Sequence, residues 1–256
     1  MLSSANIKLI NSLRLKKYRE RNKLFVIEGD KFIKEVLERG RHVKLLLARD
    51  EWLNMTDKEL LSPVDEIITV NERELAKVSR LKTPQNTLAL INIEKHTVDM
   101  RSIVRNLSIA LENIQDPGNL GTIIRIAAWF GIDNILCSKG TVDLYNPKTI
   151  QASMGALLHV KVTYTNLVDI IPDLVKSGTP VYAASLDGEP VQNIEKKTYG
   201  VLLFGNESKG ISGELMHYVS HKIVIPPYKK VLPGIESLNV AVSAAIICNE
   251  FRRDDR

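Results

Sequence analysis

The segment NIQDPGNLGTIIRIAAWFG, from Asn113 to Gly131, joins the end of an apolar strand to a glycine turn and the start of a helix. Such a turn is a typical phosphate site, because the backbone N–H groups at a helix N-terminus attract anions. Its glycines, however, follow a G-x-x-G pattern and not the G-x-G-x-x-G pattern of dinucleotide sites. The segment therefore predicts a polar site of another kind, with Asn113, Asn119 and Arg125 as candidates.

Asn119 is predicted to cap a helix that begins near Leu120, because its side-chain oxygen can accept from a free N–H of the first turn. Arg125 follows one and a half turns later among apolar neighbours. A buried arginine requires a counter-charge. That partner is either an acidic residue of the same domain or an anion from outside, such as a phosphate or a second subunit's carboxylate.

A second polar loop, FGNESKGIS, follows the apolar strand 200–204. Gly205 allows another group to approach the backbone closely, and Ser212 is predicted to cap the next helix. Glu207 lies within the turn and brings a carboxylate to it. Turns of Gly, Asn and Ser are also common where no ligand binds, so this loop does not decide the function alone.

The third polar segment, ESLNVAVSAA, opens the last helix, which we expect over 238–251. Ser237 is predicted at the N-cap and Asn239 in the first turn. Beyond them the helix is apolar almost all round, which predicts burial on most faces by its own domain or by a second subunit. Asn239 then needs hydrogen-bond partners at the N-terminus of this helix.

These segments are positioned by a regular alternation of strands and helices from residue 107 onward. The strands are expected within 107–114, 134–138, 160–164, 181–186, 200–205 and 222–227, and the helices over 120–130, 147–157, 166–176, 212–219 and 238–251. Strands this apolar are buried on both faces, which predicts an α/β fold with a doubly wound parallel sheet. Ligands bind such sheets at the carboxyl ends of the strands, where the three polar loops would converge.

The first part of the chain differs from the rest in its sequence pattern and in its charge. We expect one domain over residues 1–95, a polar linker over 96–106 and a second domain over 107–256. Residues 1–95 contain 19 Lys and Arg against 14 Asp and Glu, whereas the rest of the chain is balanced. Within 8–23 the excess is steeper, and the candidate residues for contact with a polyanion are Arg14, Lys16, Lys17, Arg19, Arg21 and Lys23. This pattern predicts phosphate contacts with a polyanion, or else a solvated basic helix.

Composition excludes several classes of protein. No apolar run approaches the roughly 20 residues that a membrane span needs, and the N-terminus has no secretion signal. Cys137 and Cys248 lie in apolar company, and the five histidines have no cysteines at zinc-ligand spacing. We therefore expect a cytoplasmic protein with reduced cysteines, no membrane association and no metal.

The three segments together resemble the SpoU (TrmH) family of SPOUT RNA methyltransferases over roughly residues 107–252. The first motif is Asn113, Asn119, Gly121 and Arg125; the second is Phe204-Gly205-Asn206-Glu207 with Gly210; the third is Ile225-Pro226 followed by Ser237-Leu238-Asn239. The N-terminal sequence LRLKKYRERNKLFVIEGDKFIKEVL is similar to that family's substrate-binding domain, a smaller α/β domain of the L30e type.

The resemblance implies methyl transfer from S-adenosylmethionine to a ribose 2′-hydroxyl of RNA by a homodimer. It also implies a parallel sheet with a deep trefoil knot. The cofactor would contact Gly205, Ile225, Leu238 and, less firmly matched, Ala183 or Ala184. Arg125 would act as a base or as an electrostatic group. Because arginine stays protonated in ordinary sites, we favour the electrostatic role, with Asn119, Glu207, Ser237 and Asn239 forming a polar shell around it.

One departure from the family pattern is the longer loop 227–236, which adds Lys229 and Lys230 next to the expected cofactor site. These lysines are either a further RNA contact or a solvated loop. The resemblance favours ribosomal over transfer RNA as substrate, while the residues specify neither the nucleotide nor a housekeeping or resistance role. A non-catalytic RNA-binding protein is the alternative of another class. A nucleotide-dependent Rossmann enzyme is disfavoured by the missing glycine fingerprint.

Overall fold

The computed structural model describes residues 1–228 and 237–253, and the chain divides into two compact units. The first comprises Met1–Glu94 with Tyr145–Ile150, and the second comprises Lys95–Leu144 with Gln151–Arg256. The stretch 96–106, expected to be a linker, contains the short helix α6 (Met100–Ile103), and Ile103 is fully buried in the core of the second unit. The stretch 96–106 contains too few apolar residues for the sequence to predict this packing.

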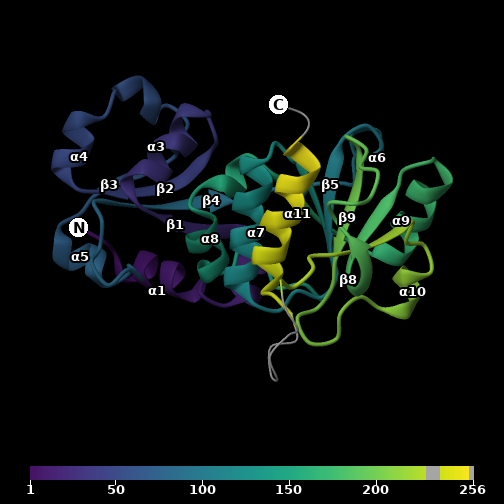
Figure 1. The fold of residues 1–256 in the computed structure, drawn as a ribbon. Helices are drawn as coiled ribbons and strands as arrows, with labels where there is room; N and C mark the ends of the chain where they lie inside the picture. The colour runs from purple at the N-terminus through teal and green to yellow at the C-terminus, as the bar shows by residue number, and fades with distance from the viewer. Residues whose placement is uncertain (229–236, 254–256) are drawn as a thin grey trace. The chain divides into compact units, whose positions relative to one another are not determined.

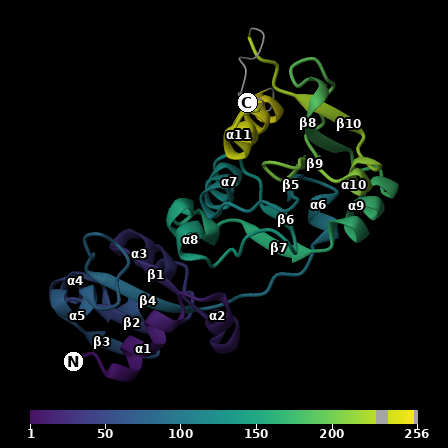
Figure 2. The same cartoon turned by 90° about the horizontal axis from the view of Figure 1, so that it is seen from below.

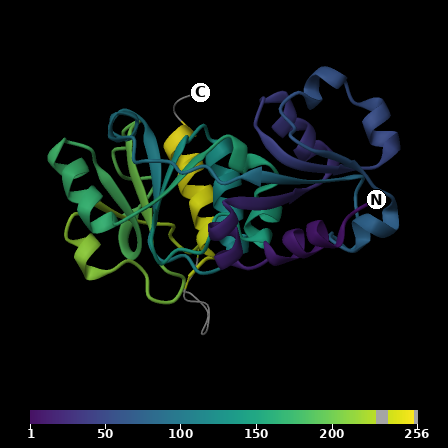
Figure 3. The same ribbon diagram turned by 180° about the vertical axis from the view of Figure 1, so that it is seen from behind.

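The first unit is a four-stranded sheet in the order β1-β4-β2-β3, in which only β2 and β3 are parallel. The elements of its main segment are α1 (Ser4–Ser12), α2 (Lys16–Asn22), β1 (Leu24–Glu28), α3 (Asp30–Glu38), β2 (Val43–Ala48), α4 (Asp50–Met55), the 3-10 helix η1 (Lys58–Leu61), β3 (Ile67–Thr69), α5 (Glu72–Ala76) and β4 (Thr87–Asn92). Helix α3 buries Ile33, Val36 and Leu37, which recur at helical spacing. Helices α1 and α5 pack against the strands through Ile10 and Leu75 (Figures 1 and 3).

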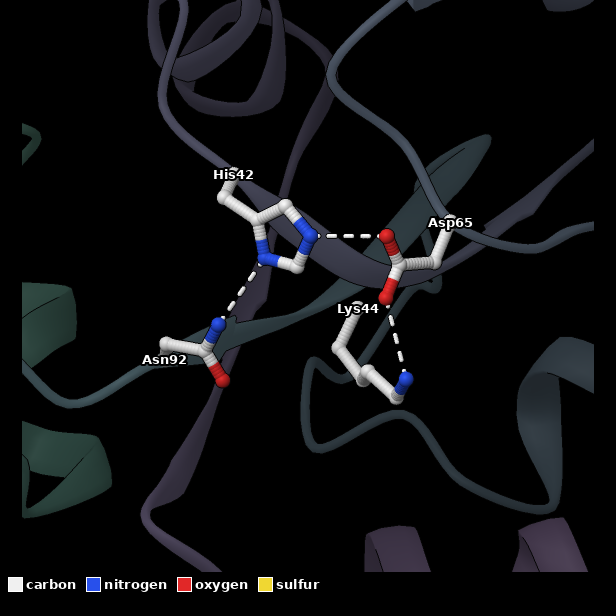
Figure 4. A network of polar contacts seen from close by, with 4 residues as sticks. All are labelled: His42, Lys44, Asp65 and Asn92. Atoms are coloured by element: carbon white, nitrogen blue, oxygen red, sulfur yellow. Dashed lines mark hydrogen bonds and ion pairs between the residues drawn. The ribbon is translucent and has the colours of Figure 1, made fainter.

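A polar network ties the ends of three strands of this sheet together (Figure 4). The Asp65 carboxylate lies 2.7 Å from His42 Nε2 and accepts from Lys44 Nζ at 2.9 Å, while Asn92 Nδ2 lies 2.9 Å from His42 Nδ1. Lys44 and then His42 hold the pKa of Asp65 below its ordinary value. All of these side chains are solvent-exposed, so the network contributes little to stability but fixes the loops that enter β2 and β3.

The second unit is a six-stranded sheet in the order β10-β8-β9-β5-β6-β7, and every pair of neighbouring strands is parallel. This confirms the predicted α/β fold. From residue 104 onward the elements are β5 (Leu107–Leu111), α7 (Pro117–Trp129), β6 (Asn134–Ser138), α8 (Pro147–Ser153), the 3-10 helix η2 (Ala156–Leu158), β7 (Lys161–Thr165), α9 (Leu167–Lys176), β8 (Val181–Pro190), β9 (Gly200–Phe204), α10 (Gly213–Met216), β10 (His221–Val224) and α11 (Val240–Arg252).

Helices cover both faces of this sheet, as the buried strands require (Figure 2). One layer comprises α6, α9 and α10, whose buried Ile103, Ile171 and Leu215 belong to one core cluster with the strands. The other layer contains α7 and α11, which pack against each other. All residues of β5 and β9 are buried, which is why these strands read as continuous apolar runs.

The chain changes direction across the sheet between β5 and β9, which lie side by side at its centre. After β5 the chain moves outward through β6 and β7, and it later returns through β8 and β9 on the other side. Leu111 pairs with Phe204, so the first and second polar loops leave the sheet next to each other. This is the switch point at which open parallel sheets bind their ligands.

Both cysteines are free and buried, and burial raises the pKa of both thiols, that of Cys248 to about 12. They are therefore protonated packing residues and not nucleophiles. Among the helices that the structure describes, none combines the length and apolar character needed to cross a lipid bilayer.

Candidate active site

Helix α7 begins at Pro117, earlier than predicted, and its N-cap is Asp116. The Asp116 carboxylate accepts from the Asn119 backbone N–H at 2.8 Å, so Asn119 lies in the first turn and the prediction that it caps the helix is wrong. Aspartate followed by proline is itself a recognised helix start, because proline suits the first helical position. Because Asp116 caps the helix, the Asn119 side chain is available for other contacts.

Helix α11 begins at Val240 with Asn239 as its N-cap, so the prediction of Ser237 at this position is wrong. Asn239 Oδ1 accepts from the backbone N–H groups of Ala241 and Val242 at 2.9 and 3.3 Å. Ser237 is exposed and precedes the helix by two residues. Capping uses the oxygen of the Asn239 amide and thereby directs its NH2 group away from the helix.

The three motifs meet in one hydrogen-bonded relay, which we define as Asn239, Asn119 and Glu207. Asn239 Nδ2 donates to Asn119 Oδ1 at 2.9 Å, and Asn119 Nδ2 donates to Glu207 Oε1 at 3.0 Å. Each amide therefore has a defined orientation, and the relay ends on a carboxylate, which only accepts. The Glu207 Oε2 atom also accepts from the Gln115 backbone N–H at 3.4 Å.

The second motif holds Glu207 in place through a compact turn. Asn206 and Gly210 exchange two backbone hydrogen bonds of 2.9 Å, and Asn206 Oδ1 accepts from the N–H groups of Ser208 and Lys209. A Cβ added to Gly205 would lie 2.2 Å from the Gly210 carbonyl carbon. The turn therefore requires glycine at position 205, in agreement with the predicted close approach.

A cavity of about 460 Å³ lies beside the relay. Its lining residues are polar or glycine: Glu112, Asn113, Gln115, Asn206, Lys209, Gly210 and Ser212. Asn206 Nδ2 donates to the Asn113 carbonyl at 2.8 Å, and buried Glu112 accepts from the Ser212 N–H at 2.8 Å. Ser212 caps α10 as predicted. These bonds bind the loops after β5 and β9 to each other.

Arg125 lies outside the relay. Its side chain is exposed, not buried, and Nη1 contacts the Met154 sulfur at 3.0 Å. Six residues of helix separate it from Asn119, which places the two side chains on different faces of α7. The expected shell around Arg125 is therefore not assembled within a single chain.

Helices α7 and α11 pack against each other, and exposed apolar side chains lie on or next to them; together with Arg125 on α7 we call these residues the α7–α11 surface. Its large exposed members are Trp129, Met154, Leu238 and Val242, with exposed fractions of 78%, 71%, 49% and 48%. Helix α11 is thus buried on one side only, through Ala244, Ile247 and Cys248 among others. Its own domain therefore buries or half-buries most of the apolar residues of this helix, and Val242 is the apolar residue of α11 that is exposed.

The predicted cofactor residues lie at the carboxyl ends of neighbouring strands. Gly205 follows β9, Ile225 follows β10, and Ala184 follows the part of β8 that pairs with β9. All three are half-buried, whereas Leu238, next to the relay residue Asn239, is about half exposed. None carries a charge. Lys229 and Lys230 lie outside the described residues.

The basic residues of the first unit have two different environments. Arg19 is buried, and its Nη1 donates to the carbonyls of Leu13 and Arg14 at 2.8 and 2.9 Å. It therefore fixes the end of α1, and the prediction that it contacts RNA at the surface is wrong. The other candidates, Arg14, Lys16, Lys17, Arg21 and Lys23, are exposed. Arginine can bridge carbonyls at a helix end as well as phosphates, and charge pattern alone does not separate the two uses.

Sequence reasoning missed three residues that build the site: Asp116, Gln115 and Glu112. The N-cap role of Asp116 could have been predicted from the sequence, because aspartate before proline is a common helix start. Gln115 and Glu112 act through tertiary contacts, since Gln115 Nε2 donates to the Gly140 carbonyl at 2.8 Å and Glu112 reaches Ser212. Within residues 1–228 and 237–253, no cluster of His, Cys, Asp and Glu is suited to hold a metal ion.

The chain is similar to known proteins over most of its length. The SpoU rRNA Methylase family model matches residues 106–249, and the MRM3-like substrate binding domain matches residues 4–89. The 23S rRNA (guanosine(2553)-2′-O)-methyltransferase RlmP of Bacillus subtilis is 32% identical over 94% of this chain and 93% of its own length.

Solved structures show the same similarity. A TrmH-family protein from Porphyromonas gingivalis has a TM-score of 0.86 at 35% identity, covering 99% of each chain. An AdoMet-bound rRNA methyltransferase from Sinorhizobium meliloti has a TM-score of 0.83 at 28% identity, covering 99% of this chain and 97% of its own. The relay at the switch point and these matches show that the chain belongs to the SpoU rRNA methylase family.

Proposed function

We propose that this protein transfers a methyl group from S-adenosylmethionine to a ribose 2′-hydroxyl of ribosomal RNA. The observation that carries the proposal is the relay, which brings residues 119, 207 and 239 together at the switch point of the sheet. Ribosomal RNA is preferred over transfer RNA because the Bacillus subtilis relative is named for a 23S rRNA nucleotide and the N-terminal model is a substrate-binding domain of an rRNA methyltransferase type.

The residues at the strand ends fit the cofactor. Ala184, Gly205 and Ile225 are uncharged and half-buried, and they present backbone groups and small apolar surfaces to a ligand. Such surroundings suit an adenine ring and its hydrogen-bonding edges. When bound, S-adenosylmethionine supplies an electrophilic methyl group on a sulfonium. As in that family, the C-terminal segment is proposed to thread through a loop and form a deep trefoil knot.

Methyl transfer to a hydroxyl is an in-line displacement, so the protein must align the acceptor and stabilise the charge that develops on its oxygen. The relay positions the acceptor side of the site, because its amides are locked by capping and by Glu207. Ser237, exposed beside Leu238, adds a hydroxyl to this polar shell. Arg125 binds the acceptor phosphate and stabilises the developing alkoxide, since a guanidinium remains protonated.

We further propose that Arg125 acts on the relay of a second copy of this chain. The α7–α11 surface exposes Trp129 and Val242 around Arg125, and an apolar patch of this kind marks an interaction site. A symmetric homodimer through this surface would complete two sites, each with the relay of one protomer and the Arg125 of its partner. The enzyme is proposed to be cytoplasmic and to need no metal.

The proposal is tested by mapping 2′-O-methyl groups in total RNA from cells with and without the gene. One ribosomal RNA position should lose its methyl group in the deletion strain and regain it on complementation. Calorimetry with S-adenosylhomocysteine should show one site per chain. A modification that disappears from transfer RNA would redirect the proposal, and binding of NAD in place of S-adenosylhomocysteine would refute it.

A further inference from the structure

A second polar feature lies in the first unit, in the segment between α5 and β4. Arg80 is half-buried there, and its Nη2 atom is buried with no hydrogen-bond partner among the residues that the structure describes. Buried donors in folded proteins are almost always paired, because an unpaired donor has lost its water contacts without replacement. An orphaned guanidinium nitrogen therefore indicates a group that an outside acceptor would satisfy.

The nearest carboxylate does not serve as that acceptor. Glu28, at the end of β1, accepts from the Arg80 backbone N–H at 3.0 and 3.2 Å and from the Ser79 hydroxyl at 2.5 Å. The Ser79 oxygen in turn accepts from the Leu81 N–H at 3.2 Å. Glu28 thus holds the backbone of this segment in place and leaves the Arg80 guanidinium without a direct ion pair.

The other charged neighbours of Arg80 are cations. The pKa of Arg80 falls to about 10, first because of burial and then because of Arg14, with Glu28 opposing and Arg19 adding to the effect. Arg19 cannot move away, since its Nη1 is bonded to the carbonyls of Leu13 and Arg14. Arg14 and Arg19 thus act electrostatically on Arg80 with one carboxylate opposing them, and this excess of positive charge favours an anion.

We infer that Arg80, together with exposed Arg14, forms a binding site for a phosphate group of the RNA backbone, to which buried Arg19 adds positive charge without a direct contact; this rests on the proposed action on RNA. A guanidinium presents its donors in a planar fork that matches two phosphate oxygens. A bound phosphate would satisfy the orphaned Nη2 and offset the repulsion among the three cations. Exposed Arg14 borders the site, and exposed Lys82 follows two residues after Arg80.

The test compares Arg80→Met with Arg73→Met in the full-length protein. Both changes remove one positive charge, and Arg73 is an exposed arginine on α5. RNA affinity is measured by fluorescence anisotropy with a ribosomal RNA fragment at several salt concentrations, in the presence of S-adenosylhomocysteine. We expect Arg80→Met to weaken binding by about tenfold and to reduce the salt slope by about one, whereas Arg73→Met changes the affinity less than about twofold.

Thermal unfolding separates a ligand site from a structural role. If Arg80 serves RNA, Arg80→Met should keep or raise the unfolding temperature, because it removes an unpaired donor and a cation from a cationic cluster. A lowered unfolding temperature together with unchanged RNA affinity would overturn the inference. Arg80→Lys should retain only part of the affinity, since lysine keeps the charge but not the planar fork.

Two further measurements identify the ligand. If inorganic phosphate stabilises the wild-type protein while Arg80→Met binds RNA normally, the site takes small anions and the inference about RNA is wrong. Methyl transfer by Arg73→Met should match the wild-type rate, because Arg73 lies outside both the relay and the inferred phosphate site. Absence of methyl transfer in the wild-type protein would refute the proposed function and leave the binding measurements interpretable.

Discussion

Asn119 donates a 3.0 Å hydrogen bond to Glu207, although 88 residues separate them in the chain. The bond crosses the switch point between β5 and β9, where Leu111 pairs with Phe204. It continues to Asn239 at the start of α11, so that an interruption at Asn119 disconnects all three motifs.

Asn119→Ala should therefore lower the methyl-transfer rate roughly 10- to 100-fold, because the acceptor would lose its positioning groups while the fold persists. The measurement is single-turnover methylation of RNA at saturating cofactor. Asn106→Ala is the matched control, since Asn106 bonds only a backbone carbonyl before β5 and should react at the wild-type rate. An unchanged rate for Asn119→Ala would show that the relay is structural.

Arg125→Ala should abolish methyl transfer and leave S-adenosylhomocysteine affinity nearly unchanged, because the one polar contact of the Arg125 guanidinium among the described residues is with the Met154 sulfur, away from the expected cofactor residues. If it acts on the partner's relay, inactive Arg125→Ala and inactive Asn239→Ala chains should complement each other when co-expressed. Random pairing places one intact site in each mixed dimer and restores about a quarter of the wild-type activity. No recovery would mean that Arg125 acts within its own chain.

Trp129→Glu should convert the proposed dimer into a monomer, because it places a charge on the α7–α11 surface, where the tryptophan is 78% exposed. Analytical ultracentrifugation measures the change in mass, and methyl transfer should be lost with it. Met55→Glu, at an exposed position of the first unit, should leave the mass unchanged. A wild-type protein that sediments as a monomer would refute the dimer.

Gly205→Ala should destabilise the second motif, because the new Cβ would lie 2.2 Å from the Gly210 carbonyl carbon and the backbone must shift. We expect a loss of about 1–3 kcal/mol in the free energy of unfolding and weaker S-adenosylhomocysteine binding. Gly213→Ala is the control, since nothing lies within 4 Å of its added Cβ. Equal effects of the two substitutions would contradict the close approach at Gly205.

Asp65→Asn should lower the unfolding temperature slightly at pH 7 and by progressively less as the pH falls below 3.8. Bonds from Lys44 and His42 keep the folded pKa of Asp65 below its ordinary value of 3.8. The contribution to stability is thus present above the unfolded pKa and is lost as the pH falls through the folded pKa. A difference between variant and wild type that stays constant from pH 7 to pH 3 would exclude this charge linkage.

The sequence by itself determined the class of fold and the motif residues. Apolar runs such as 107–111 and 200–204 can be recognised as strands in the sequence, because a strand buried on both faces contains almost no polar residue. The motif loops can be recognised in the sequence, because few residues can replace glycine, asparagine and proline where the backbone turns sharply. Family resemblance then related these residues to a cofactor and to RNA.

Only the tertiary structure decided which of those residues meet. It joined Asn119 to Glu207 and Asn239, separated Arg125 from them, buried Arg19 against the end of α1 and left the Nη2 atom of Arg80 without a hydrogen-bond partner among the described residues. Charge and spacing along the chain are the same for an arginine that caps a helix and for one that faces solvent. Partners are chosen by packing between segments that lie far apart in sequence, and that choice has no local signature.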